Sequence, residues 1–160
     1  MIDLVGLVHQ LADRLLAKQL KITAAESCTG GMIASLLTEL PGSSVWFERG
    51  FVTYSNLAKQ EMLGIKPELI QTYGAVSKEV VTAMALGALT HSAADISIAV
   101  TGIAGPGGGS VEKPVGTVWF AWAMNSLPVQ SSGHSFPQVS RQKIRQLACA
   151  TALEGAIALL

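Results

Sequence analysis

Ala24-Ala25-Glu26-Ser27-Cys28-Thr29-Gly30-Gly31 is the stretch around which this sequence is organised. The β-branched segment 21–23 precedes it and the apolar-periodic segment 32–37 follows it, which predicts a strand, a turn and a helix in that order. One interpretation is an ordinary turn in which Ser27 or Thr29 caps the helix. The other is a ligand site, because glycines let a ligand approach the backbone and a helix N-terminus offers unpaired N–H groups to an anion or a developing oxyanion.

Length and composition indicate one domain, residues 1–160, with a substantial core. Lys+Arg and Asp+Glu both number 11, so no basic excess favours a nucleic-acid partner. Charged residues make up only 14% of the chain, a low content for a surface that faces only solvent. We therefore expect a homodimer or a higher homo-oligomer.

Cysteine usage and hydropathy indicate a cytoplasmic protein. Cys28 and Cys149 are far apart and match no zinc-binding spacing, so we expect neither a metal site nor a disulfide framework. The first residues include an early acid and no basic segment, unlike a secretory signal. No apolar run reaches the ~18 residues that a membrane span needs, so we expect no membrane partner.

Hydrophobic periodicity predicts the elements of an α/β fold. Helices are predicted over 3–19, 32–40, 57–63, 68–72, 80–93 and 140–160. Strands are predicted over 21–23, 45–54, 95–101, 115–123 and 129–136, with a bulge at Gly50. This order predicts a mixed β-sheet flanked by α-helices on both faces.

A glycine-rich loop follows the buried-looking strand 95–101. Residues 102–110 include five glycines, which indicates a loop shaped for a ligand or for close backbone approach. The loop lacks the Gly-Lys-Ser/Thr of a Walker A motif and does not open a helix as a dinucleotide fingerprint does, but a backbone nest for a phosphate remains open. If its strand runs parallel to and beside 21–23, both unusual loops face one cleft.

Catalysis by a hydroxyl or thiol of the first turn needs a base. Ser27, Cys28 and Thr29 are the candidate nucleophiles. The histidines are His9, His91 and His134. None of them has a visible partner, and a structural or solvated role is the simpler interpretation of each. Lys59 is the remaining base: a desolvated lysine can accept a proton, although at this spacing a solvated helix lysine is more frequent.

Five blocks of the sequence, in this order, resemble the CinA C-terminal domain family. They are A-E-S-C-T-G-G (25–31), G-S-S-x-W-F-E-R-G-F-V-T-Y-S-N-x-x-K (42–59), G-A-V-S (74–77), T-G-I-A-G-P-G-G (101–108) and K-P-V-G-T-V (113–118). Five ordered blocks are far more specific than any single motif. The resemblance covers residues 5 to about 158.

The resemblance implies an activity. Stand-alone bacterial members of the family are nicotinamide-nucleotide amidases, which hydrolyse the carboxamide of nicotinamide mononucleotide to nicotinate mononucleotide and ammonia in pyridine nucleotide recycling. It implies Ser27 as the nucleophile, Lys59 as its partner, and no metal or cofactor. Such a dyad suits amide hydrolysis, which needs an activated hydroxyl, a proton shuttle and an oxyanion site.

The substrate also carries a ribose and a phosphate, for which we expect binding residues in three segments. Arg145 suits a phosphate through its fixed fork of donors, although a surface charge on the last helix is its simpler interpretation. The loop 101–109 is expected to share that role, Tyr54 and Asn56 to lie near the reacting end, and the backbone of the first turn to bind the oxyanion. The predicted binding residues are Thr29, Gly30, Gly31, Tyr54, Asn56, Thr101, Gly102, Gly105 and Arg145.

One departure from the family pattern and two alternatives remain. Family members commonly carry Gly-Asp-Arg before the last helix, whereas residues 138–141 read Gln-Val-Ser-Arg, so that only Arg141 is retained. Longer family members carry a further domain and are associated with competence, which leaves open a non-catalytic nucleotide-binding or regulatory module. Catalysis by Cys28 is the other alternative, and it would require an exposed thiol of low pKa.

Overall fold

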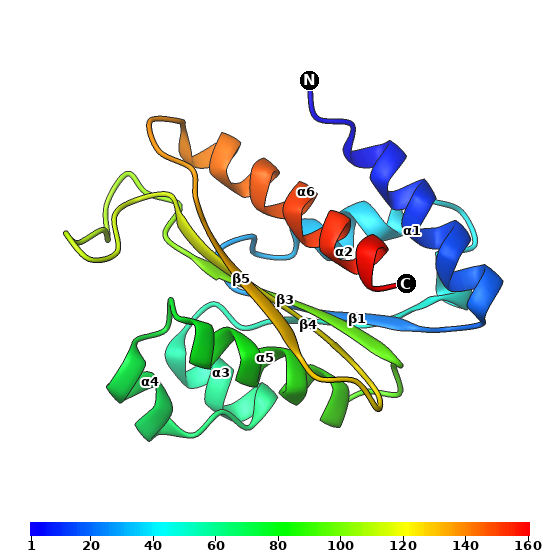
Figure 1. Cartoon of the computed structure of the whole chain (residues 1–160), viewed down its shortest axis with the longest axis horizontal. Coiled ribbons are helices and arrows are strands. Elements are labelled where there is room, and N and C mark those ends of the chain that lie inside the picture. Colours follow the sequence, from blue (N-terminus) through cyan, green and yellow to red (C-terminus); the bar gives the residue numbers. More distant parts are fainter.

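A mixed five-stranded sheet with the strand order β2-β1-β3-β4-β5 forms the centre of the structure, a computed structural model that describes residues 1–160 (Figure 1). The strands are β1 (Ile22–Glu26), β2 (Phe47–Val52), β3 (Ile96–Gly102), β4 (Thr117–Met124) and β5 (Gln130–Ser135). Strand β1 runs parallel to both β2 and β3, whereas β4 and β5 are antiparallel to their neighbours. The predicted α/β class with a mixed sheet is confirmed.

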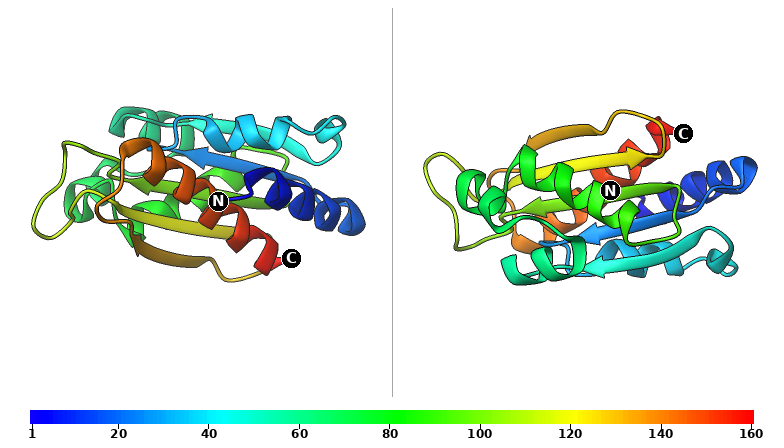
Figure 2. Two further views of the ribbon diagram at one scale, coloured as in Figure 1. Left: turned by 90° about the horizontal axis from the view of Figure 1, so that it is seen from above. Right: turned by 90° about the horizontal axis from the view of Figure 1, so that it is seen from below.

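Three helices cover each face of the sheet, as expected (Figures 1 and 2). Helices α1 (Leu4–Lys18), α2 (Met32–Thr38) and α6 (Arg141–Leu159) lie on one face. Helices α3 (Asn56–Leu63), α4 (Pro67–Tyr73) and α5 (Lys78–Thr90) lie on the other. A short 3₁₀ turn, Ser43–Val45, precedes β2. No helix is both long and apolar enough to cross a membrane.

The two faces of the sheet carry side chains of different size, and this sets how closely the helices approach. Isoleucine, valine and aromatic side chains of the central strands pack against α1, α2 and α6. Toward α5 the fully buried apolar side chains of the same strands are all alanines, Ala25, Ala99, Ala121 and Ala123, with Trp119 partly buried beside them. Close packing there lets the Ser97 hydroxyl donate to the Ala85 carbonyl of α5 at 2.7 Å. Helix α5 is thereby fixed directly against the centre of the sheet.

Three local features differ from the sequence-based expectation. Strand β1 extends to Glu26, so the turn begins at Ser27. Strand β2 is shorter than predicted because residues 43–45 form the 3₁₀ turn. The bulge is not at Gly50: the register shifts where Ile22 pairs with Phe47 and Thr23 with Arg49. Gly50 instead lies beneath α2, where a Cβ atom would come 3.3 Å from that of Ala34.

Candidate active site

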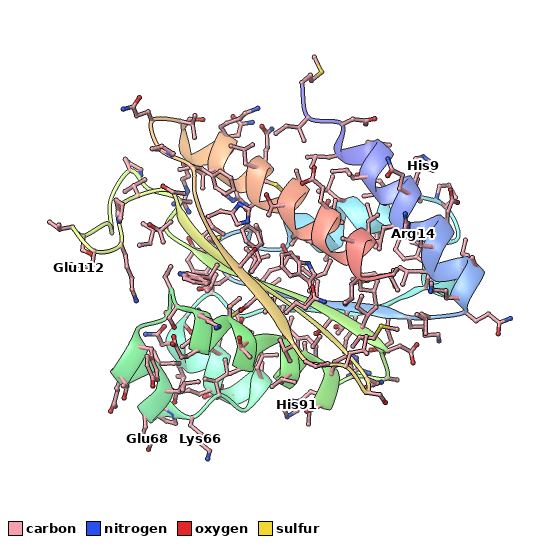
Figure 3. All side chains as sticks on the ribbon, in the orientation of Figure 1. His9, Arg14, Lys66, Glu68, His91 and Glu112 are labelled. Carbon is pink, nitrogen blue, oxygen red and sulfur yellow. The ribbon has the colours of Figure 1, made fainter.

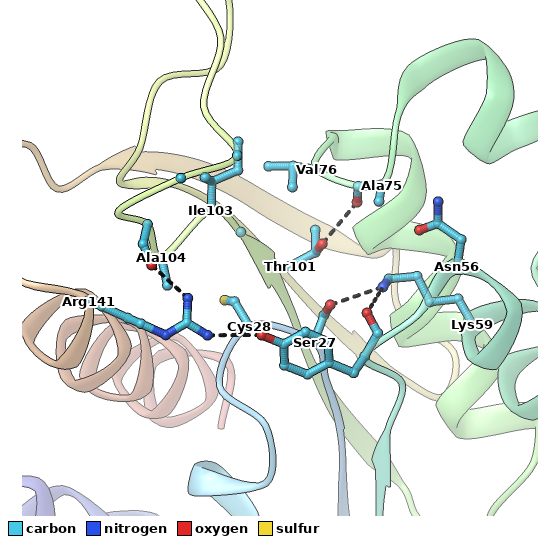
Figure 4. Close-up of a pocket in the computed structure, with 15 residues that line it drawn as sticks. Ser27, Cys28, Asn56, Lys59, Ala75, Val76, Thr101, Ile103, Ala104 and Arg141 are labelled. Atoms are coloured by element: carbon cyan, nitrogen blue, oxygen red, sulfur yellow. Dashed lines mark hydrogen bonds between the residues drawn. The ribbon is translucent and has the colours of Figure 1, made fainter.

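The segments that follow three parallel strands meet at one end of the sheet. Glu26 of β1 pairs with Val52 of β2 and with Val100 of β3, so these strands end side by side. The loops beyond them, together with the start of α6, enclose a pocket of about 270 Å³ (Figure 4). The expectation that both unusual loops face one cleft is therefore confirmed.

Ser27 and Lys59 meet at this pocket (Figure 4). The Lys59 Nζ atom lies 3.0 Å from Ser27 Oγ, 3.0 Å from the Thr53 carbonyl oxygen and 3.4 Å from that of Tyr54. Ser55 is the N-cap of helix α3, and its hydroxyl accepts from the Ala58 N–H; Lys59 follows one turn later, facing the sheet. The cap therefore fixes the direction in which the lysine points.

Lys59 is buried without a compensating carboxylate. Its side chain is only 1% exposed, and it forms no ion pair. Burial disfavours the ammonium form and lowers the pKa of Lys59 below its ordinary value of 10.5. The two backbone carbonyls accept hydrogen bonds only, so they take two N–H groups of the amine and leave its third direction for Ser27. This arrangement suits a neutral lysine that accepts the proton of a serine hydroxyl.

The carboxylate of Glu26 caps helix α2 from within the core. Its two oxygens accept from the N–H groups of Ile33 at 2.9 Å and Ala34 at 3.0 Å, and the side chain is fully buried. The interpretation that Ser27 or Thr29 caps this helix is wrong, because Gly31 occupies the N-cap and makes no side-chain bond. The N-terminus of α2 is thus already bound to a carboxylate of the protein.

Arg145 binds two carbonyl groups of the turn that follows Ser27. Arg145 Nε donates to the Cys28 carbonyl at 3.1 Å and Nη2 to the Thr29 carbonyl at 2.9 Å. Arg145 therefore contacts the turn from α6 and does not line the pocket, and neither do Thr29, Gly30 and Gly31. Four of the predicted binding residues, Thr29, Gly30, Gly31 and Arg145, therefore support the turn that carries Ser27 without lining the pocket.

The arginine that lines the pocket is Arg141, one helical turn before Arg145. Its Nη1 donates to the Gly105 carbonyl at 2.7 Å and its Nη2 to the Tyr54 hydroxyl at 2.9 Å. The predicted residues Tyr54, Asn56, Thr101, Gly102 and Gly105 also line the pocket. The retained arginine of the altered 138–141 segment was the sequence signal for this position.

The glycine-rich loop offers donors to the same pocket. The backbone N–H groups of Ala104, Gly105, Gly107 and Gly108, all lining residues, donate to no acceptor of the protein. Thr101 donates its hydroxyl to the Ala75 carbonyl at 2.9 Å, which ties the end of β3 to the segment before α5. Arg141 and these N–H groups together give one side of the pocket a positive potential suited to an anion.

Neither Cys28 nor any histidine fits the role of nucleophile or base. The Cys28 thiol is buried, and burial raises its pKa to about 11, so it is not a thiolate near neutral pH. None of the histidines lines the pocket. His9 lies on the outer side of α1 and His91 at the end of α5 (Figure 3), and His134 packs against Phe120 and Phe136. No cluster of His, Cys, Asp and Glu is arranged to bind a metal ion.

Comparison with known proteins identifies the family of this chain. The sequence model of the CinA C-terminal domain matches residues 5–160. The chain belongs to the CinA C-terminal domain family. The blocks that resemble this family include the three loops that meet at the pocket, so the family assignment and the site concern the same residues.

Relatives cover most of the chain. It is 49% identical over 148 residues to the nicotinamide-nucleotide amidohydrolase PncC of Enterobacter agglomerans, covering 92% of this chain and 90% of the relative. It is 54% identical over 121 residues to the PncC of Escherichia coli K12, covering 76% and 73% of the two chains. The crystal structure of the competence/damage inducible protein CihA from Agrobacterium tumefaciens superposes with a TM-score of 0.97 at 46% identity, covering 99% of this chain and 96% of the other.

Proposed function

We propose that this CinA-family protein hydrolyses the carboxamide of nicotinamide mononucleotide to nicotinate mononucleotide and ammonia through a Ser27–Lys59 dyad. The observation that carries the proposal is the buried Lys59 amine, 3.0 Å from Ser27 Oγ at the pocket. The names of the two PncC relatives support the amide of a nicotinamide nucleotide as the substrate. A buried lysine with a lowered pKa is a suitable base for a serine nucleophile.

The first half-reaction forms an acyl-enzyme. Ser27 Oγ attacks the carboxamide carbon while its proton passes to the neutral Lys59 amine, and the carbonyl oxygen becomes an oxyanion. Lys59, now an ammonium, gives that proton to the departing NH₂ group, so the carbon–nitrogen bond breaks and ammonia leaves. Backbone N–H groups of the 27–31 turn stabilise the oxyanion.

The second half-reaction uses the same lysine. Lys59 removes a proton from a water molecule that attacks the ester carbon of the acyl-enzyme, and then returns the proton to Ser27 Oγ as the ester bond breaks. The products are the nicotinate nucleotide and the free serine. No metal or cofactor is needed for either step, because the lysine carries each proton.

The phosphate of the nucleotide binds the positive side of the pocket. Arg141 and the unpaired N–H groups of Ala104, Gly105, Gly107 and Gly108 are the donors available there. Arg141 takes the role that the sequence suggested for Arg145, whose two bonds to the turn hold it outside the pocket. Tyr54 and Asn56 also line the pocket, where they contact the ribose or the ring.

Ammonia release from nicotinamide mononucleotide tests the dyad. The wild-type protein is expected to release ammonia, and both Ser27→Ala and Lys59→Met are expected to lower kcat by at least about 10³-fold. Lys66→Met is the matched control, since Lys66 is an exposed lysine. Full activity of Lys59→Met would contradict the dyad and direct the search to another base.

A non-catalytic nucleotide-binding module is the alternative. It is suggested by longer relatives, such as the CinA-like protein of Akkermansia muciniphila, of whose length the match covers 34%. Calorimetric titration separates the two functions. Binding of the nucleotide by the wild type without ammonia release would favour the module, whereas turnover that depends on Ser27 excludes it.

A homodimer is the proposed assembly. The low charge content supports it, as do exposed apolar side chains such as Val45, Leu57 and Leu86. Sedimentation velocity over a concentration series is expected to give the mass of two chains. A mass of one chain at every concentration would contradict the dimer.

A further inference from the structure

The backbone N–H groups of the turn after Ser27 divide into bound and free donors. The Ser27 N–H donates to the Val100 carbonyl at 3.0 Å, and the Gly30 N–H donates to the Ser27 carbonyl at 3.0 Å. The N–H groups of Cys28 and Thr29 donate to no acceptor of the protein. These two free donors directly follow the nucleophile in the chain, where an oxyanion formed at the attacked carbon would lie.

The carbonyl groups of the same peptides are all held. The C=O and N–H of a trans peptide point in opposite directions, so fixing a carbonyl also fixes the N–H of the next residue. The Cys28 N–H is set by the Ser27 carbonyl, which accepts from Gly30. The Thr29 N–H is set by the Cys28 carbonyl, which accepts from Arg145 Nε at 3.1 Å. Arg145 thus orients the second free donor directly.

The second hydrogen bond of Arg145, to the Thr29 carbonyl, affects the Cys28 N–H less directly, through one further peptide group. Arg145 Nη2 holds the Thr29 carbonyl at 2.9 Å, and this peptide contains the Gly30 N–H that binds the Ser27 carbonyl. Gly30 adopts the left-handed backbone that this arrangement needs, with a φ of 57°. The Met32 N–H also donates to the Thr29 carbonyl, at 3.0 Å, so Arg145 shares the orientation of the first donor, whereas it alone holds the carbonyl that sets the second.

Arg145 has no other polar partner. It is half-buried on α6, forms no ion pair, and directs two of its donors at the turn. We propose that Arg145 is a positioning residue that orients the N–H groups of Cys28 and Thr29 as the oxyanion-binding donors. This inference rests on the proposed serine-based reaction and deepens it, since it assigns the oxyanion site and the residue that builds it.

Comparison of two ligands separates positioning from a general loss of structure. One is an analogue of the mononucleotide with an aldehyde in place of the carboxamide. Ser27 Oγ adds to its carbonyl carbon, the hydroxyl proton passes to Lys59, and the carbonyl oxygen enters the oxyanion site. The other is nicotinate mononucleotide, the product, which needs no such site. An inhibition constant reports the affinity of the folded protein alone, so partial unfolding of a variant would not change it.

Arg145→Ala is expected to weaken the aldehyde by about 10²-fold and to lower kcat similarly, the cost of losing an oriented oxyanion donor. Its inhibition constant for the product and its KM are expected to stay within about twofold. Arg145→Lys is expected to fall between, because a lysine cannot reproduce the two-pronged contact. Lys143→Ala, which removes a charge from the same helix, is the matched control.

Labelling of Ser27 by a fluorophosphonate keeps the test independent of the natural substrate. Oγ bonds to phosphorus, the proton passes to Lys59 and fluoride leaves, while the phosphoryl oxygen uses the oxyanion donors. Arg145→Ala is expected to be labelled about 10²-fold more slowly. Equal weakening of aldehyde and product, or unchanged labelling, would overturn the positioning role, and so would absence of labelling in the wild type. Normal labelling of the wild type without ammonia release would contradict only the proposed substrate.

Discussion

At the scale of single residues, the site depends on a buried lysine whose charged form the fold disfavours. A buried ammonium normally requires a carboxylate, and Lys59 has only Ser27 and two backbone carbonyls. Burial therefore lowers the pKa of Lys59. The nearby Cys28 thiol responds in the opposite sense, because burial raises its pKa and removes it as a competing nucleophile.

The pH dependence of kcat follows from the state of Lys59. The base is the neutral amine, so kcat is expected to fall as the pH drops through the lowered pKa of Lys59 and to level off above it. A pH–rate profile with nicotinamide mononucleotide measures this acidic limb. A profile that stays flat down to about pH 5 would contradict lysine as the base.

Protein stability should change with pH in the same direction. The unfolded chain keeps the lysine at its ordinary pKa of 10.5, so between the two pKa values the unfolded state binds a proton that the folded state does not. The contribution of Lys59 to the free energy of unfolding is therefore expected to rise with pH across that window. Urea unfolding of the wild type and Lys59→Met, compared at several pH values, measures the difference.

At the scale of elements, the strand-turn-helix unit is closed by Glu26. The carboxylate ends β1 and caps α2, so it sets the length of the turn that carries Ser27. Glu26→Gln keeps the shape but exchanges one acceptor oxygen for an NH₂ donor that faces a backbone N–H. We expect a loss of about 1–3 kcal/mol in the free energy of unfolding.

Chemical denaturation measures that change. Glu39→Gln is the control, because Glu39 is an acidic residue at the C-cap of the same helix and its side chain makes no hydrogen bond. An unchanged free energy of unfolding in Glu26→Gln would mean that the helix is held by packing instead. The expected activity of the folded variant is also reduced, because the turn would no longer be fixed next to Ser27.

The junction of β3 with the glycine-rich loop has no room for a side chain. A Cβ atom at Gly102 would lie 2.8 Å from Val118 Cγ2, 3.0 Å from the Thr117 carbonyl oxygen and 3.1 Å from Cys28 Sγ. We expect Gly102→Ala to cost about 1–3 kcal/mol of stability and to lower kcat by displacing Cys28. Gly107→Ala is the control, since nothing lies within 4 Å of its Cβ position. Equal melting temperatures of the two variants would contradict this steric argument.

At the scale of the whole molecule, the order of elements could be predicted because each one has a local signal. Periodic apolar residues and the capping serines Ser55 and Ser77 are signals that lie within a few residues of the helix they mark. The glycine-rich loop and the family blocks likewise marked the segments that form the pocket. Such signals need no knowledge of the packing.

The features that could not be predicted depend on contacts between distant segments. Arg141 and Arg145 lie one turn apart on α6, and only the packing of Ile144 and Ala148 on the sheet decides which arginine reaches the pocket. The capping role of Glu26 was hidden because it lies five residues before the N-cap Gly31 and acts across the turn. The burial of Lys59 likewise follows from how α3 sits against the sheet.

Helix α6 also determines where the protein can be attached to a solid support. Arg141, its first residue, lines the pocket, and the 18 steps to Leu159 at a rise of 1.5 Å place that residue roughly 27 Å away along the axis (Figure 1). A support attached at the Leu159 end of α6 is therefore separated from the pocket by the length of the helix. The protein can be anchored to a bead or an electrode by that end, with the pocket at a distance from the surface.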